Sequence, residues 1–128
     1  MSGFEEFKGK QGLNRMINAL GYSRDGLRAA WKNEAAFREE VLLAAIALPL
    51  ALVLGRTGVE RALLVGSILV VLIVEILNSA VEAVVDQASP EKHDLAKRAK
   101  DMGSAAVLFS LINAALIWAC VLWPMGRG

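Results

Sequence analysis

A run of twenty residues, Ala62–Val81, contains a single charged residue, Glu75. A helix needs about 20 mostly apolar residues to cross the hydrocarbon core of a bilayer. The run therefore predicts a membrane-spanning helix. A carboxylate at membrane depth costs roughly 2.5–3.5 kcal/mol on insertion scales, and such a group usually faces a protein interior or a wet cavity and serves a function. Glu75 is therefore the first candidate functional residue.

Further polar residues follow Glu75 at helical spacing. In the stretch EILNSAVEAVVD, Glu75, Asn78, Glu82 and Asp86 are separated by three, four and four positions. At 100° per residue these side chains fall on one stripe of a helix, which we call the polar face. One interpretation is that the polar face only holds helices together in lipid. Asn or Ser would do so at a lower cost than Glu, so a functional role is favoured.

Two other apolar stretches complete an all-α membrane fold. The chain has 128 residues, enough for one domain, and its 55% hydrophobic content and mean hydropathy of +0.46 are too high for an ordinary soluble domain. Val41–Gly55 is the first uncharged stretch and contains Pro49, which can kink a helix. Met102–Gly126 is the last and has twenty-five uncharged residues. We therefore expect three transmembrane helices in each protomer.

The distribution of positive charge predicts the orientation in the membrane. Basic residues lie mainly before the first stretch and between the second and third. By the positive-inside rule the N-terminus and the 86–101 loop are cytoplasmic, and the C-terminus is on the outer side. Trp118 and Trp123 fit an outer interfacial belt. The basic residues in question are Lys8, Lys10, Arg15, Arg24, Arg28, Lys32 and Arg38, then Lys92, Lys97, Arg98 and Lys100.

Several function classes receive no support. The net charge of +1 gives no general attraction to nucleic acid, and the single Cys120 excludes an intrachain disulfide framework. The first forty residues are charged and lack the apolar core of a cleavable signal peptide. The chain has no GxxxxGK[ST] loop, and its one histidine, His93, has no Cys or His neighbour, so a transition-metal site is not expected.

The N-terminal third is expected to lie on the membrane surface. Leu13, Met16, Ile17 and Leu20 recur at i, i+3, i+4 and i+7 and predict an amphipathic helix that ends at Gly21, followed by a turn over 21–26. A second stripe begins at Leu27 and includes Glu34, which either is functional or pairs with Arg38. The expected organisation is a mobile tail over 1–12, a surface helix over 13–34, and helices over 35–55, 62–86 and 95–123, with a tight turn at 55–58.

The charged residues expected at the inner membrane face suit phosphoryl transfer. Carboxylates suit Mg²⁺, Lys and Arg suit phosphate oxygens, and a deeper carboxylate could take a proton from a lipid hydroxyl. A channel or transporter subunit with Glu75 in its pathway, or a structural adaptor, remains open on these grounds. Three spans enclose little volume, so we expect a homo-oligomer. The acids are Glu34, Glu82, Asp86 and Asp101, and the bases are Arg15, Arg28, Lys97 and Lys100.

Three motifs resemble the prokaryotic integral-membrane diacylglycerol kinases. They are GYSRDGLRAAWKNEAAFREE, VEILNSAVEAVVD and RAKDMGSAAVL, and the resemblance extends over residues 12–123. It implies a homotrimer in the bacterial inner membrane, with three spans and a surface helix per protomer. It also implies ATP and Mg²⁺, diacylglycerol as the acceptor, phosphatidic acid as the product, and a role in diacylglycerol recycling.

The resemblance implies roles for individual residues. Glu75 matches the catalytic base beside Asn78, and Glu34 and Glu82 match the carboxylates that hold the metal. The nucleotide site would be formed by Arg15, Tyr22, Glu34, Glu82, Lys100 and Asp101, with Glu91, Lys92 and His93 from the inner loop. The lipid site would be lined by Arg15, Arg28, Ala29, Ala30, Trp31, Ala36, Phe37, Arg38, Glu39, Glu40 and Glu75, with Ser104, Trp118 and Trp123.

Two alternatives are kept beside this interpretation. A sister group of the same fold resembles kinases that phosphorylate undecaprenol, although AAWKNEAAFREE is more similar to the diacylglycerol branch. The other alternative is a small pore or adaptor without enzymatic activity. Offering both lipids with Mg-ATP separates the three.

Overall fold

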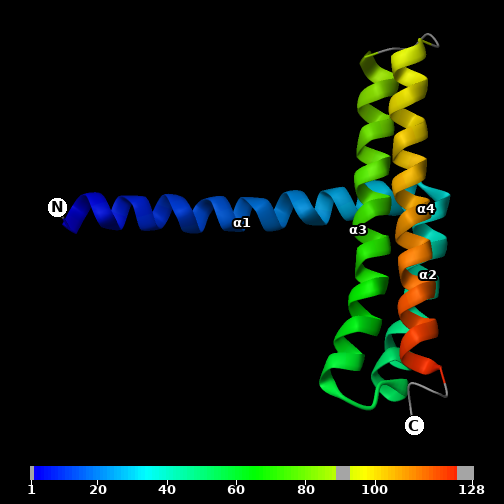
Figure 1. Cartoon of the computed structure of the whole chain (residues 1–128). Helices are drawn as coiled ribbons and strands as arrows, with labels where there is room; N and C mark the ends of the chain where they lie inside the picture. Colours follow the sequence, from blue (N-terminus) through cyan, green and yellow to red (C-terminus); the bar gives the residue numbers. More distant parts are fainter. Residues whose placement is uncertain (1, 89–92, 124–128) are drawn as a thin grey trace. The chain divides into compact units, whose positions relative to one another are not determined.

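The computed structural model describes residues 2–88 and 93–123, with side chains from residue 9 onward. Over these residues the chain forms four helices and no strand, which confirms the all-α fold class. They are α1 (Ser2–Asn33), α2 (Ala35–Leu54), α3 (Gly58–Ala88) and α4 (Asp94–Leu122), as shown in Figure 1. The chain divides into two compact units, Met1–Glu34 and Ala35–Gly128.

The first unit is one continuous helix, and this corrects the sequence analysis. The prediction that a helix ends at Gly21 and is followed by a turn over 21–26 is wrong, because α1 passes through both glycines, Gly21 and Gly26. Neither has a positive φ. A helical Gly costs only about 1 kcal/mol relative to Ala, and no Pro in α1 removes a backbone donor, so the flanking residues can maintain the helix.

The second unit is a bundle of α2, α3 and α4. Helices α3 and α4 run side by side in opposite directions, and α2 packs against α3 (Figure 1). Apart from Phe37 of α2, the apolar core between α2 and α3 includes small and branched side chains, which are Ala44 and Ala51 from α2 and Leu64, Ser67 and Val71 from α3. Small residues let the helix backbones approach closely, as is common where helices pack in membranes.

Two helices in the described part of the chain are long and apolar enough to cross a membrane, α3 and α4. Only 22% and 6% of their most apolar windows are buried within the chain, so most of this apolar surface is open to other contacts. Helix α2 has 20 residues but begins with the charged run Arg38–Glu40, so it does not satisfy the same criterion.

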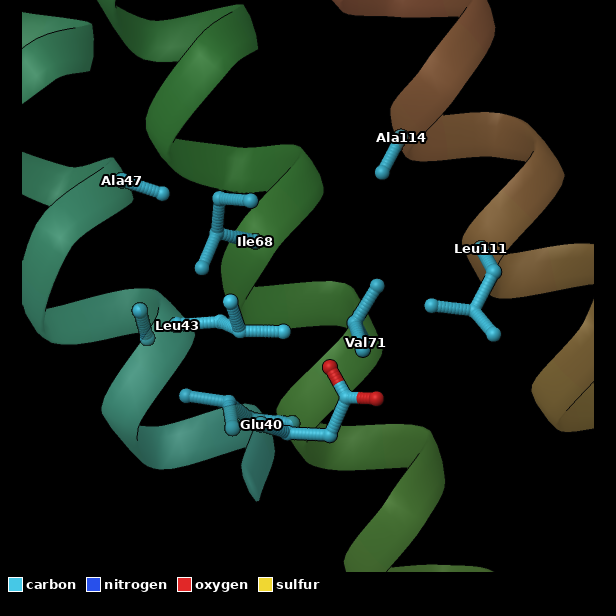
Figure 2. A pocket seen from close by; sticks show the side chains of 9 residues that line it. Glu40, Leu43, Ala47, Ile68, Val71, Leu111 and Ala114 are labelled. Carbon is cyan, nitrogen blue, oxygen red and sulfur yellow. The ribbon is translucent and has the colours of Figure 1, made fainter. Parts of the chain in front are cut away.

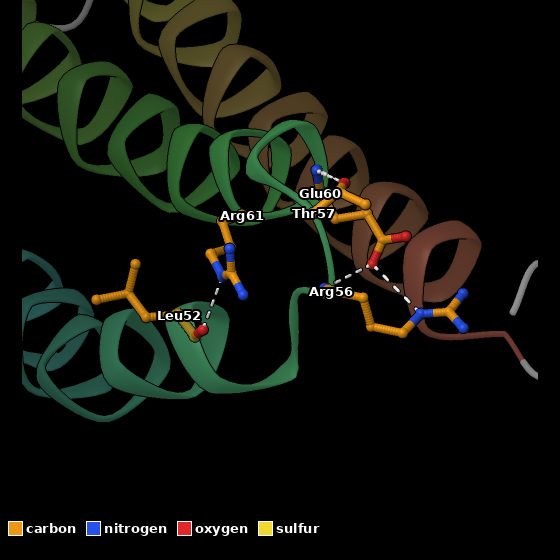
Figure 3. A network of polar contacts seen from close by, with 5 residues as sticks. All are labelled: Leu52, Arg56, Thr57, Glu60 and Arg61. Atoms are coloured by element: carbon orange, nitrogen blue, oxygen red, sulfur yellow. Dashed lines mark hydrogen bonds and ion pairs between the residues drawn. The ribbon is translucent and has the colours of Figure 1, made fainter.

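A network of polar contacts closes the turn between α2 and α3 (Figure 3). Thr57 Oγ1 accepts a hydrogen bond from the Glu60 N–H at 3.1 Å, and Glu60 Oε1 accepts one from the Arg56 N–H at 3.0 Å. Thr57 caps the helix as in a capping box, except that the Glu60 carboxylate accepts the N–H of the residue before the cap. This cap explains why α3 begins at Gly58 and not at residue 62 as expected. Arg61 Nε donates to the Leu52 carbonyl at 3.1 Å, where α2 ends.

The tight turn expected at 55–58 is present, and it depends on glycine. A Cβ atom at Gly55 would lie 2.6 Å from Arg61 Cγ and 3.1 Å from the Ala51 carbonyl oxygen. The space for these contacts exists only because position 55 has no side chain.

Candidate active site

The polar face of α3 lies partly against α4. Glu75 is buried, with 6% of its surface exposed, while Asn78 and Glu82 are half-buried and Asp86 is exposed. Asn78 Nδ2 donates a hydrogen bond to Glu82 Oε1 at 3.2 Å, one helical turn further along. The buried end of the polar face is therefore the Glu75 end, and its solvent-exposed end is at Asp86.

The other atom of the Asn78 carboxamide is in an unusual position. Within the residues the structure describes, Asn78 Oδ1 is a buried side-chain oxygen with no hydrogen-bond partner. It lies directly against Gly103 of α4, at the place where any other residue would carry its Cβ atom. A buried polar atom without a partner in a native protein calls for an explanation, and a catalytic role is one of the usual ones.

Ion pairs connect the exposed end of the polar face to the first turns of α4. Lys100 Nζ lies 2.5 Å from Asp86 Oδ1, and Lys97 Nζ lies 2.7 Å from Asp101 Oδ2. The hydrogen bond to Asp86 raises the pKa of the Lys100 ammonium group above its ordinary value, and the nearby Glu82 charge acts in the same direction. Lys100 and Asp101, expected to act together on nucleotide, are thus each paired with a different residue.

An apolar groove of about 180 Å³ lies among α2, α3 and α4, with Glu40 at its edge (Figure 2). Its other lining residues come from all three helices, and they are Leu43, Ala44, Ala47, Ile68, Val71, Leu72, Leu111 and Ala114. Glu40 precedes the apolar run that begins at Val41. Burial raises the pKa of its carboxyl group above the ordinary value, and the charge of Glu39 adds to this.

The remaining expected lipid contacts in the second unit differ in exposure. Phe37 is buried, Arg38 is half-buried, and Ala36, Glu39, Ser104 and Trp123 are exposed. Trp118 is half-buried, and its indole Nε1 donates a hydrogen bond to Ser67 Oγ at 3.0 Å. The polar atom of Trp118 therefore faces α3.

In the first unit, the expected site residues run from Arg15 to Glu34, along α1 and just past its end. Arg15, Tyr22, Arg28, Ala29 and Trp31 are exposed, and Ala30 is buried. Glu34 is half-buried, and its N–H donates to the Ala30 carbonyl at 2.9 Å just after α1 ends. From the inner loop, His93 is exposed at the start of α4, while Glu91 and Lys92 are outside the described residues.

Sequence reasoning missed Gly103 and Ser67. No spacing rule connects Gly103 with Asn78. Ser67 lies in the middle of an apolar run, so its bond to Trp118 needs the packing of α3 on α4. Asp86 was assigned to the polar face, but its partner Lys100 is visible only in the structure.

These features define a class of protein. It is an all-helical protein with membrane-length helices and a polar face that lies partly between two of them. Among the described residues, no group of three or more His, Cys, Asp or Glu side chains forms a metal cluster.

Comparison with known proteins identifies the family. The prokaryotic diacylglycerol kinase family model matches residues 21–122, which include the whole polar face and its α4 neighbours. A diacylglycerol kinase of Escherichia coli is 54% identical over 112 residues, which cover 88% of this chain and 92% of that protein. One from Pseudomonas aeruginosa is 51% identical over 91% of this chain and 94% of its own length. One from Helicobacter pylori is 45% identical, over 92% of both chains. The chain belongs to the prokaryotic diacylglycerol kinase family.

Proposed function

We propose that this protein is an ATP-dependent diacylglycerol kinase of the bacterial inner membrane. The observation that carries the proposal is the polar face, Glu75 to Asp86, which lies on a membrane-length helix and wholly inside the family match. The relatives named above are diacylglycerol kinases, and this chain matches them over nearly their full length. The reaction is transfer of the γ-phosphoryl group of ATP to the free hydroxyl of sn-1,2-diacylglycerol, which yields phosphatidic acid and ADP.

Glu75 acts as the general base. Its burial on an apolar helix suits a group that must meet a lipid hydroxyl away from bulk water. As the hydroxyl oxygen forms its bond to the γ-phosphorus, the bond from phosphorus to the bridging oxygen of ADP breaks, and Glu75 takes the hydroxyl proton. Asn78 lies one turn away on the same face and orients the groups around the transferred phosphoryl.

Glu82 and Glu34 would hold Mg²⁺, which neutralises phosphate charge during transfer when it is bound. The donor set fits, because carboxylate oxygens are the hard ligands that Mg²⁺ prefers, and the Glu82 carboxylate is half-buried on the polar face. Lys100 and Asp101 bind the nucleotide, with Arg15, Tyr22, Glu91, Lys92 and His93 as further contacts.

The lipid approaches from the membrane. The apolar groove beside Glu40 offers space for an acyl chain, which is consistent with a lipid contact over Ala36–Glu40. Further contacts come from Arg15, Arg28–Trp31, Ser104, Trp118 and Trp123. Helix α2 is the third membrane span, three protomers assemble into a trimer, and the N-terminus is cytoplasmic with the C-terminus in the periplasm.

The nucleotide and the lipid are expected to meet α3 at different depths, the nucleotide at Glu82 and the lipid hydroxyl at Glu75. Glu82 and Glu75 are seven residues apart, which is about 10 Å along a helix at 1.5 Å per residue. Glu82 is nearer the charged end of α3, where the nucleotide arrives, and Glu75 is deeper. The acceptor hydroxyl is therefore expected to react at the headgroup boundary.

The test is a phosphorylation assay with the purified full chain in mixed micelles with Mg-ATP. The acceptors are sn-1,2-diacylglycerol, undecaprenol and free glycerol. We expect rapid phosphorylation of diacylglycerol and very little of the other two. Preference for undecaprenol would assign the chain to the polyprenol branch, and efficient phosphorylation of glycerol would show that the site opens to water. No phosphorylation of any acceptor would contradict a kinase function.

A further inference from the structure

The contact between Asn78 and Gly103 joins the polar face of α3 to α4. Asn78 Oδ1 is buried and without a hydrogen-bond partner, and it occupies the space where a Cβ atom at position 103 would stand. Such a Cβ atom would also lie 3.2 Å from Asn78 Cγ and 4.0 Å from Asn78 Cβ. The oxygen side of the carboxamide therefore packs against the backbone of Gly103.

The opposite side of the same carboxamide faces Glu82. Asn78 Nδ2 donates to Glu82 Oε1 at 3.2 Å, so the side chain is held between Glu82 on its own helix and Gly103 on the next. Turning the amide over would exchange its nitrogen and oxygen, and it would place an oxygen against the Glu82 carboxylate. The Glu82 contact thus determines which atom faces Gly103.

We propose that Gly103 is a positioning residue, whose missing side chain lets Asn78 lie between the two helices and hold the Glu82 carboxylate in place. The part that concerns catalysis rests on the proposed function, in which Glu82 holds Mg²⁺ and Asn78 adjoins the transferred phosphoryl group. A side chain at position 103 would either push the Asn78 carboxamide away from Glu82 or separate α4 from α3.

The substitution that tests this is Gly103→Ala, which adds only the Cβ atom. Ala is the better helix former, so the same change at an open position leaves stability unchanged or raises it. Gly66 of α3 offers that matched control, because a Cβ atom there would meet nothing within 4 Å. We expect Gly103→Ala to lower the thermal unfolding midpoint of the full-length protein in micelles, and Gly66→Ala to leave it unchanged or raise it.

A double-mutant cycle identifies Asn78 as the group that is displaced. In an Asn78→Ala background the carboxamide is gone, so Gly103→Ala should no longer lower the unfolding midpoint. This cycle needs no kinase activity and therefore stands apart from the proposed function. An equal loss of stability with and without the Asn78 carboxamide would overturn the proposal, and so would an unfolding midpoint of Gly103→Ala at or above that of the unsubstituted protein.

The catalytic consequence is measured separately on the folded Gly103→Ala variant. Displacing a positioning contact by about 1 Å can cost on the order of 10²-fold in rate. We expect a loss of that order in kcat, together with a higher Mg²⁺ concentration for half-maximal activity and an unchanged KM for diacylglycerol. A raised lipid KM with unchanged Mg²⁺ dependence would contradict the role of Gly103 in holding Glu82.

Discussion

Two groups of polar side chains in the second unit, those at the α2–α3 turn and those on the polar face, differ in the hydrogen bonds that they make. At the α2–α3 turn, the polar atoms of Thr57, Glu60 and Arg61 bind backbone groups at helix ends. On the polar face, Asn78 Oδ1 is buried without a partner and Glu75 is buried in an apolar helix. Contacts that complete helix ends serve the fold, whereas a buried oxygen without a hydrogen-bond partner carries a cost that the fold alone does not explain. This contrast supports placing the chemistry on the polar face.

The largest expected effect is that of Glu75→Gln. The amide keeps the size and most of the hydrogen bonding of the carboxylate but cannot take the proton from the acceptor hydroxyl. General-base catalysis contributes on the order of 10²–10⁴ in rate, and we expect kcat to fall by at least that factor. The measurement is steady-state turnover in micelles, with oligomeric state and ATP affinity checked alongside.

A matched substitution at the α2–α3 turn serves as the control for Glu75→Gln. Glu60→Gln makes the same chemical change at the turn, where the carboxylate accepts the Arg56 N–H bond and lies 3.8 Å from Arg56 Nε, and its turnover should stay near that of the unsubstituted protein. Near-normal turnover in Glu75→Gln would mean that Glu75 is not the base and that the contrast between the two places does not predict function.

The second expected effect concerns Glu34 and Glu82. If both hold one Mg²⁺ ion, removing either should raise the Mg²⁺ requirement and weaken nucleotide binding. The double variant should then lose less than the sum of the two single losses, because residues that serve one ion are coupled. Mg²⁺ titrations of Glu34→Gln, Glu82→Gln and the double variant measure this coupling. Strictly additive losses would indicate two separate sites.

A smaller effect is expected at the turn. Thr57→Ala removes the acceptor for the Glu60 N–H, and loss of such a cap costs about 1 kcal/mol of stability. Unfolding by SDS titration in micelles should show this loss, with kcat unchanged. Thr57→Ser keeps the hydroxyl and is the control. A large fall in kcat for Thr57→Ala, at full folding, would show that the turn has more than a structural role.

The smallest effect is expected for Ser67→Ala. It removes the acceptor of the Trp118 Nε1–H bond, and a hydrogen bond between membrane helices is typically worth about 0.6 kcal/mol. The same SDS titration, applied to Ser67→Ala, Trp118→Phe and both together, should give non-additive losses because the two residues share one bond. Independent losses would show that this bond does not stabilise the packing of α3 on α4.

Local chemistry explains most of what could be predicted before the structure was known. The apolar runs indicated the helices that became α3 and α4, because about twenty mostly apolar residues have few alternatives to a helix in lipid. The polar face followed from spacings of three and four on a helix. The T-x-x-E pattern of residues 57–60 is typical of a helix start, yet α3 was expected to begin at residue 62, four residues after its observed start at Gly58. The prediction that a helix ends at Gly21 gave too much weight to glycine as a helix terminator, because α1 continues to Asn33.

The sequence alone therefore determined the apolar runs of α3 and α4 and the polar stripe, since each depends on residues within a few turns of one another. Only the tertiary structure decided which residues of α4 meet that stripe. The Asn78–Gly103 contact and the Asp86–Lys100 ion pair connect positions far apart in the chain, and their register depends on how α3 and α4 pack side by side. No sequence pattern marks Gly103 as important, because its role depends on which atom of another helix occupies the place of its missing Cβ.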